Sequence, residues 1–325
     1  MKSIIKYKKI VRALMTLAGF MFILALNAQD ENTEIQTKPK HSYAKNTFES
    51  VWLMDNQTVM VPVKGTFEFD IMHRFGRVNS EGEFDLYGLF APSNIRMGFA
   101  FAPIDNLYIG SGLTKDRLIW DGSVKYAIFK QSKECCSMPV SITYYGFMSY
   151  DFKQDDEHAI YKYQTDRLRY FHQLIIARKV TSKLSIQVAP SLSYQNSVDG
   201  YYYNKEIKTD SFVRAIGSSM KHAHFAISVS GRYKLTENMS LLANYDQPLT
   251  KHTTNNPNPN LSLGLEIGTS GHAFQICVGN YRFLNPQRDN LFNKNSPLTY
   301  TNSSGQQIKG GNFSIGFNIT RLWNF

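Results

Sequence analysis

Residues 311–325, GNFSIGFNITRLWNF, indicate the fold of the whole chain because their side chains alternate with a period of two residues. One set is mostly apolar and aromatic and comprises Phe313, Ile315, Phe317, Ile319, Arg321, Trp323 and Phe325. The residues between them are mostly small and polar. This alternation is typical of a strand with one face in hydrocarbon and one facing a polar interior. A half-buried strand of a soluble sheet would show it too, so the rest of the chain must distinguish the two.

Residues 1–28 have the pattern of a secretory signal peptide. Five basic residues precede an apolar run over 13–26, which is too short for a good membrane helix and ends in small or polar residues. Without those five, 31 basic residues face 26 acidic ones, a formal net charge of +5. Export and the scattering of lysine and arginine both argue against a nucleic-acid partner.

After residue 28 no apolar stretch approaches the roughly 20 residues of a membrane helix, and the mean hydropathy of the chain is −0.32. A chain of this kind can cross a membrane only as strands. Because backbone groups in lipid must be satisfied internally, the strands must then close into a barrel.

Strands of about ten residues follow one another from Thr66 onward. We predict twelve, over 66–75, 95–102, 107–114, 119–129, 140–150, 167–180, 184–195, 222–235, 239–249, 261–268, 273–283 and 311–325. Short connections over 103–106, 131–138, 181–183, 236–238 and 269–272 alternate with mostly longer ones over 76–94, 151–166, 196–220, 250–260 and 284–310. An even strand number with short periplasmic turns and long external loops is typical of bacterial outer-membrane barrels. Residues 65–325 are therefore expected to form an all-β, antiparallel, up-and-down transmembrane β-barrel with both termini in the periplasm.

Residues 29–64 are expected to form a periplasmic N-terminal leader. The first part, to about 47, is polar and aperiodic. The part from 47 onward is too irregular for a membrane strand. A short periplasmic helix and a plug-like segment are the two alternatives for it.

Several segments together resemble a family of uncharacterised outer-membrane β-barrel proteins of Gram-negative bacteria, catalogued as a domain of unknown function. The matching segments are 47–59, 65–76, 93–131, 245–250, 271–276 and 313–323, of which HRFG and DGSVKY are the most distinctive. The adjacent Cys135 and Cys136 and the Asn- and Pro-rich loop 251–260 depart from that resemblance. It implies a barrel fold and an outer-membrane location, and it carries over no catalytic residue.

The polar alternates of the strands predict the lining of a lumen. They are Glu68, Asp70, Arg74, Lys125, Arg167, Arg169, Gln173, Gln187, Arg232, Asn244, Asp246 and Glu266. About twelve strands leave an interior narrower than that of a porin, so we expect a narrow pore or uptake channel for an unidentified small solute. The mixed charge argues against strong ion selectivity.

Two other functions stay open. A non-conducting structural or surface-binding barrel would use loops 151–166, 196–220 and 284–310, where Tyr201 to Tyr203 could stack on a ligand. An outer-membrane lipid hydrolase would need a serine and histidine pair, but no nucleophile-elbow context or catalytic triad is readable from the spacing. We therefore expect no enzymatic activity and no cofactor.

His222 and His224 are weak candidates for metal ligands, since alternate residues of a strand share one face at about 7 Å. Two donors do not make a site, and hydrogen-bonded rim histidines are the simpler interpretation. Cys135 and Cys136 leave three options open: a strained redox-active disulfide, a bond to another chain, or free thiols. Cys277 lies mid-strand, too far for an easy bond to that turn.

Phe325 and Trp323 are expected to serve as the assembly signal for the outer-membrane barrel assembly machinery. A terminal aromatic residue on an amphipathic strand resembles the signal by which that machinery recognises its substrates. The final strand must then pair with 66–75 to close the barrel. Outer-membrane lipids and lipopolysaccharide phosphates are the other expected partners.

Overall fold

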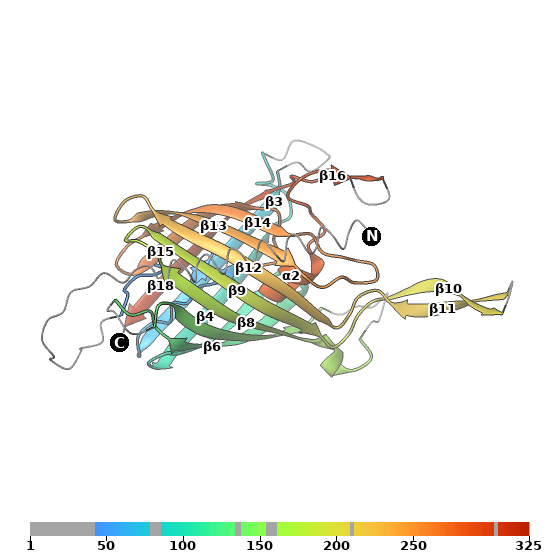
Figure 1. The fold of residues 1–325 in the computed structure, drawn as a ribbon, viewed down its shortest axis with the longest axis horizontal. Coiled ribbons are helices and arrows are strands. Elements are labelled where there is room, and N and C mark those ends of the chain that lie inside the picture. The colour runs from blue at the N-terminus through green and yellow to red at the C-terminus, as the bar shows by residue number, and fades with distance from the viewer. Residues whose placement is uncertain are drawn as a thin grey trace, which may run out of the picture.

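The computed structural model describes residues 43–78, 86–133, 138–153, 161–208, 211–301 and 305–324. Twelve antiparallel strands form a closed barrel in which neighbours along the chain are neighbours in the wall (Figure 1). They are β3 (Thr66–Arg77), β4 (Asn94–Ile104), β5 (Leu107–Thr114), β6 (Ile119–Phe129), β7 (Ser141–Asp151), β8 (Leu168–Lys179), β9 (Leu184–Gln195), β12 (Ala223–Lys234), β13 (Met239–Pro248), β14 (Asn260–Gly268), β15 (His272–Gly279) and β18 (Ser314–Asn324). The predicted fold class and strand number are confirmed.

The barrel closes between its last and first strands. β18 pairs with β3 from Ser314 opposite Arg77 to Asn324 opposite Thr66, with one irregularity between Ser314 and Gly316. The pairing that closure required is thus present. Trp323 lies against Phe67, with ring centroids 5.7 Å apart, whereas Phe325 lies outside the described residues.

Alternate residues of each strand face outward or inward, as the period of two demands. On β4 the outward Met97, Phe99 and Phe101 are 46%, 54% and 44% exposed, while the inward Arg96 is 4% exposed. The wall therefore presents apolar side chains outside and polar ones inside. None of the helices in the described ranges has the length and apolar character needed to cross a membrane.

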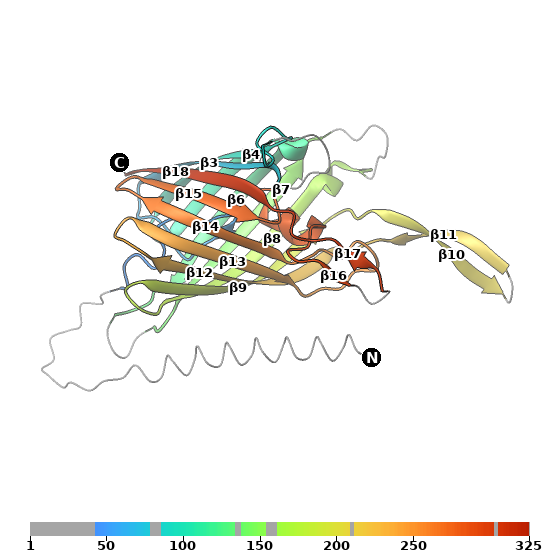
Figure 2. The same cartoon turned by 90° about the horizontal axis from the view of Figure 1, so that it is seen from above.

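The two ends of the barrel differ in their connections. We call the end with the short connections, such as the one between β4 and β5, the turn end; the opposite end is the loop end. β18 finishes at the turn end, where Figure 2 places the C-terminus, and the longer connections emerge from the loop end.

The long connection predicted over 196–220 is present, but it contains a hairpin of two further strands that was not predicted. β10 (Gly200–Lys208) pairs with β11 (Ser211–Ser218) in a sheet separate from the barrel. Figures 1 and 2 show it projecting well beyond the loop end. Aromatic and β-branched residues favour extended backbone, and here Tyr202 pairs with Ile216 and Tyr203 with Ala215.

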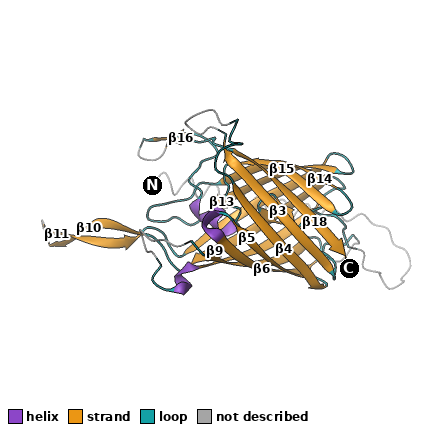
Figure 3. Ribbon diagram, turned by 180° about the vertical axis from the view of Figure 1, so that it is seen from behind, coloured by secondary structure: helices purple, strands orange, loops and turns teal. Residues whose placement is uncertain are grey.

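The predicted strand 273–283 ends early, at Gly279. The connection that follows contains a helix, α2 (Pro286–Phe292), and two short paired strands, β16 (Tyr300–Thr301) and β17 (Gln307–Ile308). α2 begins because the side chain of Asn285 accepts a hydrogen bond from the backbone N of Arg288 and Pro286 occupies the first turn. The helix is buried and contacts β8, β9 and β12, and Figure 3 shows it at the loop-end mouth of the barrel.

The segment before the barrel also forms a hairpin, in place of the alternative of a periplasmic helix. β1 (Trp52–Leu53) pairs with β2 (Asn56–Gln57), and the left-handed backbone of Met54, with φ of 56°, makes the turn between them. Every residue from Val51 to Val59 is buried. We call residues 47–60 the inner hairpin.

Candidate functional site in the lumen

The inner hairpin enters and leaves the lumen at the turn end. Before it, the backbone N of Ala44 donates to the carbonyl oxygen of Gln131, at 2.8 Å, in the connection between β6 and β7. After it, the backbone N of Gly65 donates to the carbonyl oxygen of Ala102, at 2.8 Å, near the end of β4. Both ends of the hairpin are thus tied to the same rim of the barrel.

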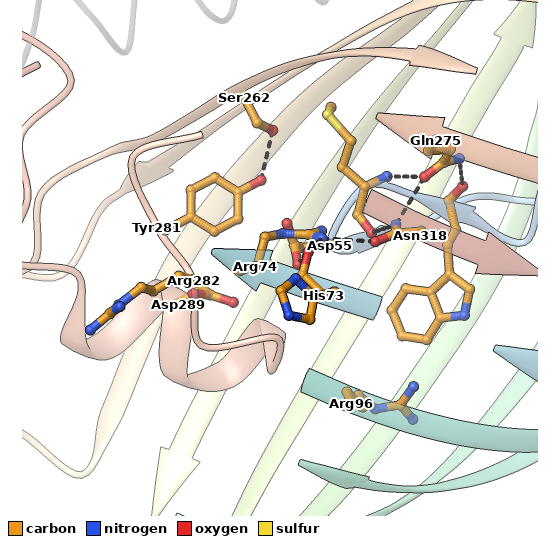
Figure 4. A network of polar contacts seen from close by, with 12 residues as sticks. Asp55, His73, Arg74, Arg96, Ser262, Gln275, Tyr281, Arg282, Asp289 and Asn318 are labelled. Carbon is orange, nitrogen blue, oxygen red and sulfur yellow. Dashed lines mark hydrogen bonds and ion pairs between the residues drawn. The ribbon is translucent and has the colours of Figure 1, made fainter. Parts of the chain in front are cut away.

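The tip of the hairpin is held by polar side chains from the strands that close the barrel (Figure 4). Arg74 on β3 forms an ion pair with Asp55, with Nη2 and Oδ1 2.9 Å apart, and both side chains are buried. Asn318 on β18 donates to the carbonyl oxygen of Met54 at 2.7 Å, and Gln275 on β15 accepts from the backbone N of Met54 at 3.0 Å. The turn backbone is therefore satisfied by the wall, as buried polar groups must be.

The other side of the hairpin contacts the opposite wall. The Asn56 amide donates to Asn244 Oδ1 at 3.0 Å and to Asp246 Oδ1 at 2.9 Å. Gln57 accepts from Lys125 Nζ at 3.0 Å, and the Gln187 amide donates to its carbonyl oxygen at 2.8 Å. Side chains from distant strands thus converge on two hairpin residues.

A second charged cluster lies on β3, β4 and β6. The Arg96 guanidinium is 2.8 Å from Asp70 Oδ1 and 2.7 Å from Asp121 Oδ1, and it lies over the ring of Trp52, 5.3 Å from the ring centroid. Two glycines make room for it. A Cβ at Gly98 would lie 2.2 Å from Asp70 Oδ2, and one at Gly112 would lie 2.3 Å from Arg96 Nη2.

The hairpin also buries apolar side chains. It contributes Phe48, Leu53, Met54 and Val59 to a buried cluster whose wall members are Tyr145, Phe147, Phe171, Ile175, Ala177, Ala189, Leu242 and Cys277. Full burial of such a side chain stabilises by about 1.5–3 kcal/mol. The hairpin is therefore seated by both polar contacts and apolar packing.

α2 occupies the lumen on the loop-end side of the hairpin tip. Asp289 accepts from the backbone N of Phe283 at 3.0 Å and of Asn285 at 3.3 Å. Burial, with the neighbouring Asp55 as the next largest cause, raises the pKa of Asp289 well above its usual value. Figure 4 shows Asp289, Asp55 and Tyr281 close to one another, and the Tyr281 hydroxyl lies 2.7 Å from Ser262 Oγ. The carboxylate of the helix therefore lies near enough to that of the hairpin for the two charges to interact.

A family model described as a membrane bound beta barrel domain (DUF5777) matches residues 48–323. The chain belongs to this family. The match begins within the inner hairpin and ends on β18, so it includes the hairpin as well as the wall. The protein is accordingly a membrane-bound β-barrel. A search of curated proteins found no match.

Solved structures of similar shape are outer-membrane barrels. The KdgM porin is 8% identical with a TM-score of 0.41, covering 79% of this chain and 98% of the porin. An outer membrane channel from Pseudomonas putida F1 is 8% identical with a TM-score of 0.44, covering 81% and 97% of the two chains. The Pseudomonas putida toluene transporter TodX is 9% identical with a TM-score of 0.35, covering 82% and 91%.

The structure of this family member buries eleven of the twelve residues predicted to line the lumen. They are Glu68, Asp70, Arg74, Lys125, Arg169, Gln173, Gln187, Arg232, Asn244, Asp246 and Glu266. The exception is Arg167, which lies in the short helix η2 (Gln164–Arg167) and donates to the carbonyl oxygens of Asp151 and Lys153 at 3.0 and 2.7 Å. Placing it on a strand was wrong, because β8 begins one residue later.

Four further wall residues contact the hairpin or its charged neighbours but were not among the predicted lining. They are Arg96, Asp121, Gln275 and Asn318. Each lies on the same face of its strand as a predicted residue or a small one, so the period of two could have identified them. Asp55, Asn56 and Asp289 had no such signal, since they lie outside the barrel strands.

The two candidate metal ligands point in different directions. His222 precedes β12, stacks on the outward Tyr194, and lies 2.8 Å from the carbonyl oxygen of Gln195. His224 is fully buried and its Nδ1 lies 2.9 Å from Nε2 of His252, with the two rings stacked. The expectation of a shared face was wrong because the strand begins only at Ala223.

In the ranges that the structure describes, no group of three or more His, Cys, Asp or Glu side chains could hold a metal ion. Cys135 and Cys136 lie outside the described residues. Cys277 is a buried free thiol in the apolar cluster around the hairpin.

Proposed function

We propose that this barrel is an outer-membrane channel for small polar solutes, held closed by its inner hairpin and opened when the hairpin withdraws. In this proposal the turn end faces the periplasm and the loop end faces outward, which is the usual arrangement of short and long connections. A signal peptide over residues 1–28 and export through the inner membrane belong to the same proposal.

The observation that carries it is the way the hairpin is attached. Its two ends are tied to the turn-end rim at Gln131 and Ala102, and β1 and β2 form a sheet of their own, separate from the wall. The hairpin can therefore leave toward the periplasm without breaking a single barrel strand pair. A wall strand could not do so, because each shares its hydrogen-bond ladders with two neighbours.

The wall behind the hairpin suits water once it is uncovered. The charged residues that are buried on the inward faces of the described strands are five cations and six anions: Arg74, Arg96, Lys125, Arg169, Arg232, Glu68, Asp70, Asp121, Asp151, Asp246 and Glu266. Such a surface is costly to leave dry and unpaired, and nearly balanced charge favours weak ion selectivity. Polar solutes of either sign fit this lining.

The apolar packing of the hairpin favours the closed state at rest. Phe48, Leu53 and Val59 lose their contacts with the wall when the hairpin withdraws. Opening therefore needs a compensating interaction, and the periplasmic end of the hairpin is where a partner can supply it.

A sealed, surface-binding barrel is the second candidate. The lumen is occupied from both sides, by the inner hairpin and by α2, and the hairpin of β10 and β11 exposes Tyr202, Val213 and Ile216 at 64%, 51% and 69%. Exposed apolar residues of this kind suit a binding surface.

Conductance in planar bilayers separates the two. Wild-type protein is compared with a variant in which residues 47–60 are replaced by a Gly-Ser linker of equal length. A channel predicts rare openings of the wild type and sustained conductance of the variant. If the variant folds, as judged by heat-modifiable gel mobility, and conducts no better than wild type, the gated channel is wrong and the sealed barrel is favoured.

A further inference from the structure

The loop end holds a basic cavity, and of its lining residues the channel proposal uses only Arg169. It has a volume of about 320 Å³ and is lined by residues from several elements, among them Tyr161, Arg169, Asp199, Arg288, Phe292 and Lys294. The barrel wall contributes Arg169 and α2 contributes Arg288 and Phe292, while Tyr161, Asp199 and Lys294 come from connections. Residues far apart in the sequence thus build one cavity on top of the occupied lumen.

Two guanidinium groups are fixed in this cavity. Arg169 Nη2 donates to the Tyr161 hydroxyl at 2.8 Å, and its Cζ lies 5.7 Å from the centroid of the Phe292 ring. Arg288 forms an ion pair with Asp116 and lies over the ring of Phe283, 4.6 Å from its centroid. Hydrogen bonds, ion pairs and ring stacking hold both groups in one orientation. The two side chains therefore lose less conformational entropy when a ligand binds.

The described lining of this cavity is basic. Arg117 and Arg169 share the carboxylate of Asp151. Within the described ranges, the one hydrogen bond of Lys294 Nζ is to the amide oxygen of Asn255, at 3.4 Å. Among the described residues, the cavity lining brings together four cations, Arg117, Arg169, Arg288 and Lys294, and one carboxylate, Asp199.

The environment of Arg288 agrees with a binding site for an anion. The side chain is nine-tenths buried, and its Nε is buried with no hydrogen-bond partner in the described part of the chain. Burial lowers the pKa of Arg288, Asp116 opposes that effect, and Arg169 and Arg117 add to it. A bound anion would supply the missing acceptor and offset the repulsion between the cations.

We infer that this cavity binds a small solute with one anionic group on a flat or cyclic body. The guanidinium groups and Lys294 hold the carboxylate or phosphate, and the rings of Tyr161 and Phe292 pack against the body of the ligand. The volume limits the ligand to about the size of one or two sugar rings.

The inference goes beyond the gating proposal, because binding at the loop end requires no movement of the inner hairpin. Its test uses the full chain in detergent and measures binding by isothermal titration calorimetry. The probes are glucuronate and benzoate, with glucose and benzyl alcohol as neutral counterparts of the same ring size. We expect both anions to bind at least tenfold more tightly than their neutral counterparts, with an affinity that falls as salt is raised.

Two variants test the assignment. Arg288→Gln and Lys294→Gln should each weaken anion binding about tenfold, because each removes one charge-assisted contact. Arg214→Gln is the matched control. Arg214 is on β11 and lies over the ring of Tyr202 on β10, away from the cavity, so binding should be unchanged. Lys294→Gln keeps the test valid if Arg288→Gln fails to fold.

Two results would overturn the inference. One is equal binding of the anions and their neutral counterparts, including no binding of either at millimolar concentration. The other is unchanged anion binding by both cavity variants. A barrel that binds the anions but never conducts would leave this site in place and reject the channel alone.

Discussion

Asp55 and Arg74 form a buried ion pair, 2.9 Å between Oδ1 and Nη2, that joins the tip of the inner hairpin to the first strand of the barrel. Arg74 also donates to Asn318 Oδ1 on the last strand, at 2.9 Å. One guanidinium therefore connects the hairpin to β3 and β18, the two strands that close the barrel. Withdrawal of the hairpin must break this contact, so substitutions in the pair test directly how stable the closed state is.

Replacing Asp55 by Asn should loosen the hairpin. Removing one partner of a buried ion pair leaves the other charge uncompensated, at a cost of about 3–5 kcal/mol. The strand pairing of the barrel wall is unchanged, so the substitution destabilises the closed position of the inner hairpin. Openings should therefore become more frequent in single-channel recordings. Glu237→Gln is the control, since Glu237 pairs with Lys234 at an exposed turn. Equal opening frequencies for D55N and wild type would contradict the role of the pair.

Replacing Gly112 by Ala should destabilise the barrel. The new Cβ would lie 2.3 Å from Arg96 Nη2 and would displace the guanidinium from Asp121. Overpacking of this kind costs about 1–3 kcal/mol, which a urea titration followed by gel mobility can measure. At the outward Gly122 the nearest atom to an added Cβ is 3.4 Å away, so G122A should stay within about 0.5 kcal/mol of wild type. Equal losses in the two variants would argue against crowding of Arg96.

Acidification should loosen the connection between β13 and β14 through His252. Burial lowers the pKa of His252, and Lys221 and Lys294 act in the same direction. A base whose pKa is lowered in the folded state contributes stability that is present above its unfolded value near 6.5 and is lost as the pH falls through its folded value. Protonation would also place a charge 2.9 Å from Nδ1 of His224.

Hydrogen exchange of residues 249–259 is the measurement for this prediction. Protection should fall between pH 7.5 and pH 5, and His252→Asn should remove most of that dependence. His222→Gln is the control because His222 contacts the backbone carbonyl of Gln195 and not another imidazole. A pH dependence that persists in H252N would assign the effect to another group.

Deleting Phe325 should reduce insertion into the outer membrane while export to the periplasm continues. The prediction rests on the terminal aromatic residue acting as an assembly signal, and it is checked by fractionation of the membranes and periplasm. Trp323→Ala should also reduce insertion, since Trp323 belongs to the same signal. It additionally removes one ring contact with Phe67, worth about 0.5–1.5 kcal/mol, so it should lower stability as well. Normal insertion of the deletion variant would reject the assembly signal.

The sequence by itself determined the wall of the barrel. Strand number, strand order, the closing pair of strands and the inward face of each strand all follow from a period of two and from alternating connection lengths. These are local properties: a residue's parity on a strand decides whether it meets lipid or lumen, whatever its neighbours are. Glu68, Lys125 and Asp246 were placed inside on that basis alone, and the same reasoning reaches Arg96 and Asn318.

Only the tertiary structure decided what fills the barrel. Nothing in the aperiodic segment around Asp55 marks it as the partner of Arg74, and nothing in the polar stretch around Asp289 marks it as a helix inside the mouth. His224 meets His252, 28 residues away, for the same reason. These contacts depend on the shape and charge of a lumen that exists only once twelve strands have closed, so no local pattern carries them.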